Sequence, residues 1–140
     1  MSSSNLKEKL TNGKPTVGGW MQIPSASVGE IMGQSGYDWV AIDMEHGNFS
    51  PQILPDICRS LELGNTLPFV RVAQNHPKDI KHALEAGAKG IIVPMVENRE
   101  QVENAISWSL YPPEGARGVG YSRANLFGKR FKDYIDSIND

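Results

Sequence analysis

Residues 37–47 read Tyr-Asp-Trp-Val-Ala-Ile-Asp-Met-Glu-His-Gly, and this stretch indicates the fold class most directly. Its apolar run, Trp39–Asp43, has the length and composition of a buried strand. Gly36, a residue type that often ends a helix, stands shortly before this run, and polar residues follow it at once. A strand placed between two helical segments in this way is typical of a βα unit.

The same order of strand and helix recurs four times, which predicts a parallel α/β sheet. Two closures fit such a series: an open doubly wound sheet, and a (β/α)8 barrel of which four units make half. In both, function sits at the carboxyl ends of the strands. Residues 4–10 are expected to form an extra helix that covers one end of the sheet. The predicted strands span 17–21, 39–43, 68–72 and 90–95, and the predicted helices span 25–35, 50–64, 77–86, 98–110 and 129–138.

The composition is that of an ordinary globular domain and excludes several classes of protein. The 140 residues include 39% hydrophobic side chains and carry a net charge of −2 with interspersed signs, so no nucleic-acid partner is expected. Residues 1–10 are polar and charged, so no signal peptide is expected, and no apolar run has the length of a membrane span. The lone Cys58 cannot form an internal disulfide and is expected to be a buried thiol. We therefore expect a cytoplasmic protein without a membrane partner.

Polar side chains capable of chemistry follow two neighbouring predicted strands. Asp43, Glu45 and His46 end the second strand, and Arg71 ends the third. An arginine can bind a carboxylate as a fork and stabilise an enolate, while a histidine takes a proton and nearby carboxylates hold its tautomer. Trp20, at the end of the first strand, is a candidate wall for such a substrate pocket. The alternative is a polar strand exit with an ion-paired arginine and a tryptophan that only packs.

A second candidate region is the glycine-rich segment 115–120, with Arg117 inside it and Arg123 just beyond. These residues can form a backbone and guanidinium cradle that binds an anionic substrate, with Arg123 as a binding residue, or a plain flexible loop. The spacing matches neither the P-loop nor the dinucleotide fingerprint. His76, His82 and Glu85 fit ordinary surface or helix positions when they are judged from the pattern alone.

Six motifs together resemble the metal-dependent pyruvate aldolases of the 4-hydroxy-2-oxoheptanedioate aldolase and citrate lyase superfamily. The resemblance covers nearly the whole chain. It implies that these residues are the first four or so units of a TIM (β/α)8 barrel, preceded by a helix. It also implies an enzyme, usually a homo-oligomer, that cleaves 4-hydroxy-2-oxo acids to pyruvate and an aldehyde through a metal-stabilised enolate. Besides residues 37–47, the motifs are Gly-Gly-Trp-Met (18–21), Phe-Val-Arg-Val (69–72), Ala-Leu-Glu-Ala-Gly-Ala (83–88), Ile-Ile-Val-Pro-Met-Val (91–96) and Tyr-Pro-Pro-Glu-Gly-Ala-Arg-Gly-Val-Gly (111–120).

The resemblance also assigns roles to individual residues. His46 matches the family's catalytic base, and Arg71 matches the arginine that binds the pyruvate carboxylate and stabilises the enolate. Glu85 stands where the family usually has an Asp that makes the histidine more basic. Asp43 and Glu45 match carboxylates around the metal-bound water, which places them outside the metal's own ligand set.

The resemblance further implies a divalent metal ion, Mg, Mn or Co, whose Glu and Asp ligands lie on later strands, so no residue of this chain is assigned to the metal. We therefore expect residues 1–140 to form a single partial aldolase domain that lacks its carboxyl-terminal half. The alternative is a catalytically inactive half-barrel that binds a small carboxylate or self-assembles, because four βα units leave two sheet edges open.

Overall fold

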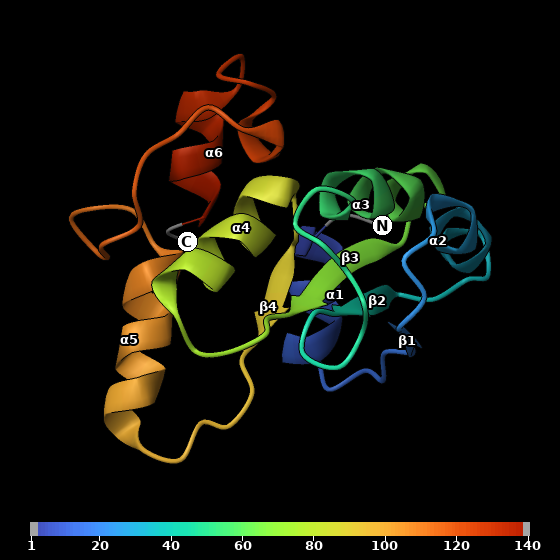
Figure 1. The fold of residues 1–140 in the computed structure, drawn as a ribbon, viewed down its shortest axis with the longest axis horizontal. Helices are drawn as coiled ribbons and strands as arrows, with labels where there is room; N and C mark the ends of the chain where they lie inside the picture. Colours follow the sequence, from blue (N-terminus) through green and yellow to red (C-terminus); the bar gives the residue numbers. More distant parts are fainter. Residues whose placement is uncertain (1–2, 139–140) are drawn as a thin grey trace.

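The computed structural model describes residues 3–138, and its helices and strands alternate as the sequence predicts (Figure 1). Each of the first three strands is followed by a helix that returns the chain to the amino end of the next strand. The fourth strand is also followed by a helix. The elements are α1 (Ser3–Thr11), β1 (Gly18–Met21), α2 (Ala26–Gly33), β2 (Trp39–Asp43), α3 (Leu54–Leu63), β3 (Leu67–Arg71), α4 (Pro77–Ala86), β4 (Gly90–Ile92), α5 (Arg99–Ser109), the 3-10 turn η1 (Arg123–Asn125) and α6 (Phe131–Ile138).

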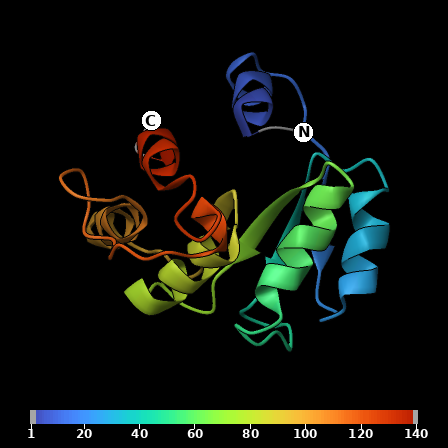
Figure 2. The same ribbon diagram turned by 90° about the horizontal axis from the view of Figure 1, so that it is seen from above.

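The four strands form one parallel sheet in the order β1-β2-β3-β4, which confirms the predicted α/β class. Helices α2 and α3 cover one face of this sheet, and α1 lies on the other side (Figure 2). The pairing places Trp20 beside Ala41, and Asp43 beside Arg71. Side chains that end adjacent strands are thereby brought to one carboxyl edge.

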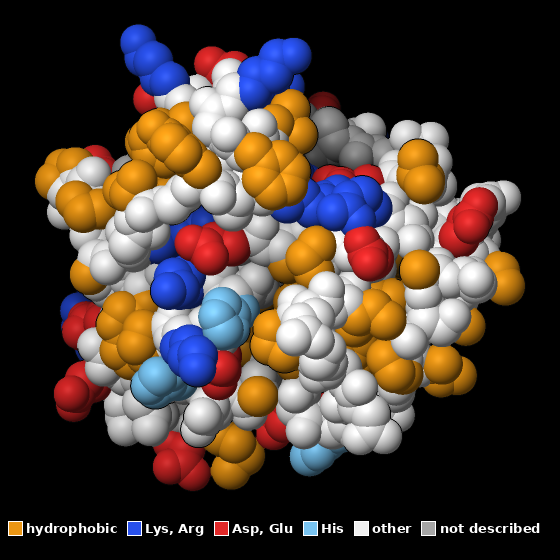
Figure 3. Space-filling model, turned by 45° about the horizontal axis from the view of Figure 1, so that its top comes forward, with side chains coloured by type: hydrophobic (Ala, Val, Ile, Leu, Met, Phe, Trp, Pro, Cys, Tyr) orange, Lys and Arg blue, Asp and Glu red, His pale blue; other side chains and the backbone are white. Residues whose placement is uncertain are grey.

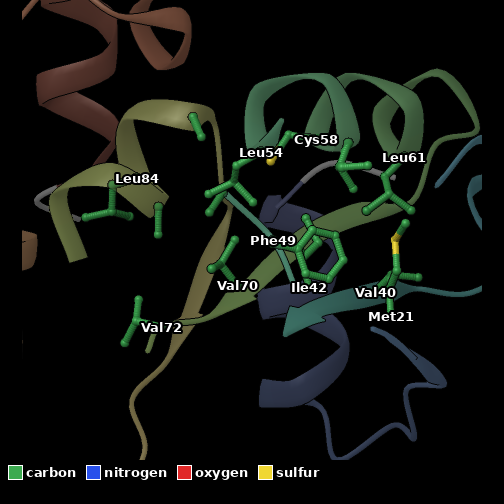
Figure 4. Packing of buried hydrophobic residues seen from close by; sticks show 14 of the residues in the cluster. Met21, Val40, Ile42, Phe49, Leu54, Cys58, Leu61, Val70, Val72 and Leu84 are labelled. Carbon is green, nitrogen blue, oxygen red and sulfur yellow. The ribbon is translucent and has the colours of Figure 1, made fainter. Parts of the chain in front are cut away.

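The hydrophobic core lies between the sheet and its covering helices (Figure 4). Alternate residues of the strands, such as Val40, Ile42 and Val70, are fully buried there against Ile57 and Leu61 of α3. Burying a side chain of this size contributes roughly 1.5–3 kcal/mol. The predicted buried thiol is confirmed in the same layer, where burial raises the pKa of Cys58 to about 12.

The opposite face of the sheet carries an aromatic pair instead of a helix layer. The rings of Trp39 and Phe69 stack with their centroids 5.5 Å apart. A Cβ added at Gly18 would lie 2.2 Å from the Trp39 ring, so β1 requires a glycine at this position. Asp43 and Arg71 follow on this same face, because each lies an even number of residues further along its strand.

The predicted extra helix is present and is tied to the amino edge of the sheet. Lys9 of α1 forms an ion pair with Asp38, just before β2, at 2.6 Å. The hydrogen bond from Lys9 and that from the backbone of Val17 hold the Asp38 pKa below its ordinary value. Leu6 of α1 is buried as well. The helix therefore covers an end of the sheet, as expected.

Two predicted boundaries differ from the structure by more than two residues, and proline explains both. The strand predicted over 90–95 ends at Ile92, because Pro94 has no N–H to donate and Met95 adopts a left-handed φ of 54°. The helix predicted over 50–64 begins only at Leu54, which places Pro55 in its first turn. A proline deeper in the helix would have broken its hydrogen bonds.

The crossing of α2 and α3 supplies a test of the packing. A Cβ at Gly64 would lie 2.2 Å from the carbonyl carbon of Gly33 and 2.7 Å from the nitrogen of Gln34. We expect Gly64→Ala to lower the free energy of unfolding by about 1–3 kcal/mol, measured by urea denaturation. Gly118→Ala, where nothing lies within 4 Å, should change it by less than about 0.5 kcal/mol. Equal effects of the two substitutions would contradict the close approach.

Candidate functional site

The carboxylate of Asp43 is the centre of a polar cluster at the carboxyl edge of the sheet. Asp43 ends β2 and its side chain is fully buried. Arg71 is its register partner at the end of β3, and the guanidinium donates from Nε to Oδ1 at 3.0 Å and from Nη2 to Oδ2 at 2.7 Å. A paired fork of this kind fixes the orientation of both planar groups.

Four further hydrogen bonds complete the environment of the Asp43 carboxylate. Oδ2 accepts from Trp20 Nε1 at 3.1 Å and from Gln22 Nε2 at 2.8 Å, and Oδ1 accepts from the backbone nitrogens of Glu45 and His46 at 3.1 Å each. Burial acts to raise the pKa of this carboxyl, but the hydrogen bonds outweigh it and hold the pKa well below its usual range. Asp43 is therefore a permanent anion that shapes the turn after β2.

The Arg71 guanidinium is paired with Asp43 but still has N–H groups that can bind a ligand. Two of its five N–H groups bond to Asp43, while Nη1 forms an ion pair with Glu45 at 3.1 Å. The side chain remains 21% exposed and lies 4.8 Å from the centre of the Trp20 ring. The hydrogen bond and charge of Asp43, with the charge of Glu45, raise the pKa of Arg71. Its terminal nitrogens can therefore present N–H groups to an anionic substrate.

His46 stands beside this cluster with its ring in solvent. Its side chain is 67% exposed, and Nε2 lies 3.8 Å from Oε1 of Glu45. Its backbone is held by Asp43, so the ring is carried on a fixed turn. The structure thus brings together five of the predicted site residues, Trp20, Asp43, Glu45, His46 and Arg71.

Gln22 belongs to the same cluster and was missed by the sequence analysis. It follows β1 directly, and its amide donates to Asp43 at 2.8 Å. The signal that could have found it is the rule already applied to Asp43 and Arg71, that polar residues after parallel strands meet at one edge.

Glu85 is not brought beside His46 within the chain. It lies in the last turn of α4, and because α4 runs back from the end of β3, this turn lies toward the amino edge of the sheet. Its carboxylate reaches instead toward Gly120, where an added Cβ would lie 3.1 Å from Oε1. Burial raises the pKa of Tyr111, and the charge of Glu85 adds a smaller effect in the same direction. Its role as acidic partner of His46 stays a prediction.

Arg123 also lies at the amino edge, away from Arg71. Its guanidinium forms an ion pair with Glu62 of α3 and donates to the carbonyl of Ala86 at 3.0 Å. It lines a cavity of about 490 Å³ beneath α6 together with Arg59. Its predicted part in binding the substrate is therefore not supported by proximity to the Asp43 cluster.

The described residues do not form a metal site. Among residues 3–138, no group of three or more His, Cys, Asp or Glu side chains is arranged to hold a metal ion. The Asp43 oxygens already accept six hydrogen bonds, and Glu45 faces Arg71. The described residues thus do not fit the divalent ion that the resemblance implies.

Fold and site together define the class of protein. Polar side chains at the carboxyl edge of a parallel α/β sheet lie where (β/α) enzymes place their active sites. Residues 17–136 match the family model for HpcH/HpaI aldolase/citrate lyase. The chain belongs to this family, which confirms the resemblance seen in its motifs.

Curated relatives show how much of the family's length is present. The chain is 38% identical over 139 residues to a hydroxypyruvate/pyruvate aldolase of Agrobacterium fabrum, covering 98% of this chain and 52% of the relative. It is 34% identical over 137 residues to a 4-hydroxy-2-oxo-heptane-1,7-dioate aldolase of Salmonella dublin, covering 96% and 52%. The chain thus spans about half the length of these relatives.

Solved structures agree with the fold. An HpcH/HpaI aldolase/citrate lyase family protein from Burkholderia cenocepacia matches with a TM-score of 0.88 and 34% identity, over 96% of this chain and 55% of that one. Macrophomate synthase matches with a TM-score of 0.79 and 30% identity, over 98% and 49%. No helix within residues 3–138 is long and apolar enough to cross a membrane.

The buried Asp43 gives stability a defined pH dependence. Its folded pKa is depressed, so its stabilising effect is complete above the unfolded pKa of about 4 and is lost as the pH falls below that value. We expect Asp43→Asn to lower the free energy of unfolding at pH 7 by about 2–3 kcal/mol. Between pH 5 and pH 2 the free energy of unfolding should also decline less in the variant than in the wild type. Urea denaturation at each pH measures this.

The matched control is Asp133→Asn, because Asp133 forms an exposed ion pair with Arg130. This substitution should change stability by less than about 1 kcal/mol and keep the wild-type pH profile. An unchanged profile in Asp43→Asn would show that the depressed pKa of Asp43 does not contribute to folding.

Proposed function

We propose that this chain carries the enolate-forming part of a pyruvate aldolase, a carbon–carbon lyase that converts 4-hydroxy-2-oxo acids to pyruvate and an aldehyde. Family membership and the aldolase names of two curated relatives support this reaction class. The observation that carries the proposal is the pairing of Arg71 with buried Asp43, directly beside an exposed His46.

Arg71 is proposed to bind the carboxylate and the oxo oxygen of the substrate. Asp43 and the Trp20 ring hold the guanidinium in one orientation, and its remaining N–H groups lie at the partly exposed end. Donors fixed in this way favour the enolate over the keto form, because negative charge grows on the oxo oxygen as the bond breaks. A preoriented arginine also avoids the entropy cost of ordering a free side chain.

His46 is proposed to act as the base. It takes the proton of the C4 hydroxyl, the C3–C4 bond breaks, and its electron pair becomes the pyruvate enolate while C4 leaves as the aldehyde carbonyl. Protonation of the enolate at C3 then gives pyruvate. Glu45, whose Oε1 lies 3.8 Å from Nε2, stabilises the protonated imidazole electrostatically. The exposed ring leaves room for a substrate to approach it.

A divalent metal, Mg, Mn or Co, belongs to the proposal only as what the family resemblance implies. None of the described residues is assigned to it. The substrate is proposed to be a small oxo acid, with no nucleic acid or membrane as partner.

Exchange of the pyruvate methyl protons tests the enolate step directly. The chain is incubated with pyruvate in D2O, with and without Mn²⁺, and deuterium incorporation is followed by mass spectrometry. We expect His46→Ala to slow this exchange by about 10²–10⁴-fold, since it removes the base without disturbing the buried cluster. His76→Asn, which retains an N-cap for α4, should keep the wild-type rate. Equal rates in wild type and His46→Ala would refute the assignment.

A second candidate is a catalytically inactive half-barrel that self-assembles. Within residues 3–138, β1 and β4 each pair on one side only. Beside β4, an apolar cavity of about 330 Å³ is lined by Val93, Val102 and Ile106, and Ile106 is 53% exposed. We propose that a second copy of the chain covers this edge, which would form a homo-oligomer.

Light scattering on the full chain tests this self-association. We expect an oligomer for the wild type and a monomer for Ile106→Glu, because a charge on the apolar surface opposes its burial. Leu63→Glu is the matched control: Leu63 is 79% exposed on α3, and this variant should stay oligomeric. A monomeric wild type would exclude this candidate.

A further inference from the structure

A cavity of about 270 Å³ lies where the start of α4 meets the end of α5 and the segment 116–118. Its charged lining is entirely basic: Lys78, Lys81 and Arg117 face it together with His76, and no carboxylate lines it. On the left of the face in Figure 3, Lys, Arg and His side chains gather in the region where α4 lies, with Asp and Glu side chains next to them that do not line the cavity. Like charges crowded around one cavity repel each other unless an anion enters.

Arg117 is the unusual member of this lining. The residue is only 3% exposed, and its Nη1 donates to the hydroxyl of Tyr134 at 3.1 Å. Its guanidinium carbon lies 4.7 Å from the centre of the Tyr111 ring and 5.4 Å from that of Tyr134. The buried Nε and Nη2 atoms have no acceptor among the described residues. Ring faces attract the cation, but they supply no acceptor for these N–H groups.

Two other arginine side chains, which are only partly buried, have carboxylate partners. Arg71 is paired with Asp43, and Arg123 with Glu62, whereas Arg117 forms no ion pair with any residue between 3 and 138. A buried guanidinium without an acceptor is costly, because its hydration is lost without compensation. An oxyanion in the adjacent cavity would provide both the missing charge and the missing acceptors.

We propose that this cavity binds the phosphate group of a small metabolite. Arg117 would supply the buried N–H donors, and Lys78 and Lys81 would neutralise the remaining charge from the rim. Three cationic side chains match a phosphate dianion better than a single carboxylate, which carries one charge. The site is separate from the Asp43 cluster, none of whose residues lines the cavity. It does not depend on the proposed aldolase reaction.

Calorimetric titration of the chain with inorganic phosphate, at constant ionic strength, tests the site. We expect saturable binding that weakens on the order of tenfold or more in the double variant Lys78→Ala/Lys81→Ala. Both lysines lie on the surface of α4, so folding should be retained, and pyruvate exchange by this variant should be unchanged. Lys7→Ala/Lys14→Ala removes the same charge from exposed positions elsewhere and should bind phosphate as the wild type does.

The outcomes separate the alternatives. Absence of saturable binding, or equal affinity in the wild type and the α4 double variant, would overturn the proposal. An equal loss in the Lys7→Ala/Lys14→Ala control would show a general charge effect and would overturn it as well. If acetate binds as tightly as phosphate, the assignment to a phosphate group is wrong. Arg117→Lys, checked for folding by circular dichroism, should also weaken binding, since lysine lacks the guanidinium fork.

Discussion

The burial of the Asp43 carboxylate is the constraint on which the rest of the site depends. A charged group out of contact with water must be fully hydrogen-bonded, and here six donors from two adjacent strands and one turn converge on it. Meeting this requirement holds Trp20, Gln22 and Arg71 in place and shapes the backbone that carries His46. The reactive groups are thus positioned by a residue that need not touch the substrate.

The sheet makes that convergence possible. Its parallel register places Asp43 opposite Arg71, and the buried aliphatic layer under α3 keeps the strands from sliding. On the other face, Trp39 and Phe69 fill the space below the polar cluster. The apolar core and the polar edge are consequences of one alternation of side chains along β2 and β3.

Much of this could be predicted from the sequence, because period and strand order place Asp43, His46 and Arg71 at one edge. The family resemblance pointed to Glu85, and the glycine-rich segment pointed to Arg123, only by position along the chain. The direction of a helix decides which end of the sheet its last turn reaches, and α4 carries Glu85 away from the carboxyl edge. Arg123 depends on a long-range ion pair with Glu62, which no local pattern encodes. Prolines set the carboxyl end of β4 and the start of α3, and hydrophobic periodicity alone does not predict these boundaries.

The central claim is that the clamped guanidinium of Arg71 and the ring of His46 form one binding site for an oxo acid. A nitrogen-resolved NMR titration with pyruvate, following the side-chain signals of both residues, tests it most directly. We predict that the Nε–H signal of Arg71 and the ring signals of His46 shift together and saturate at the same pyruvate concentration. The signal of Arg123 should stay constant. Shifts at Arg123 without any at Arg71 and His46 would contradict the account.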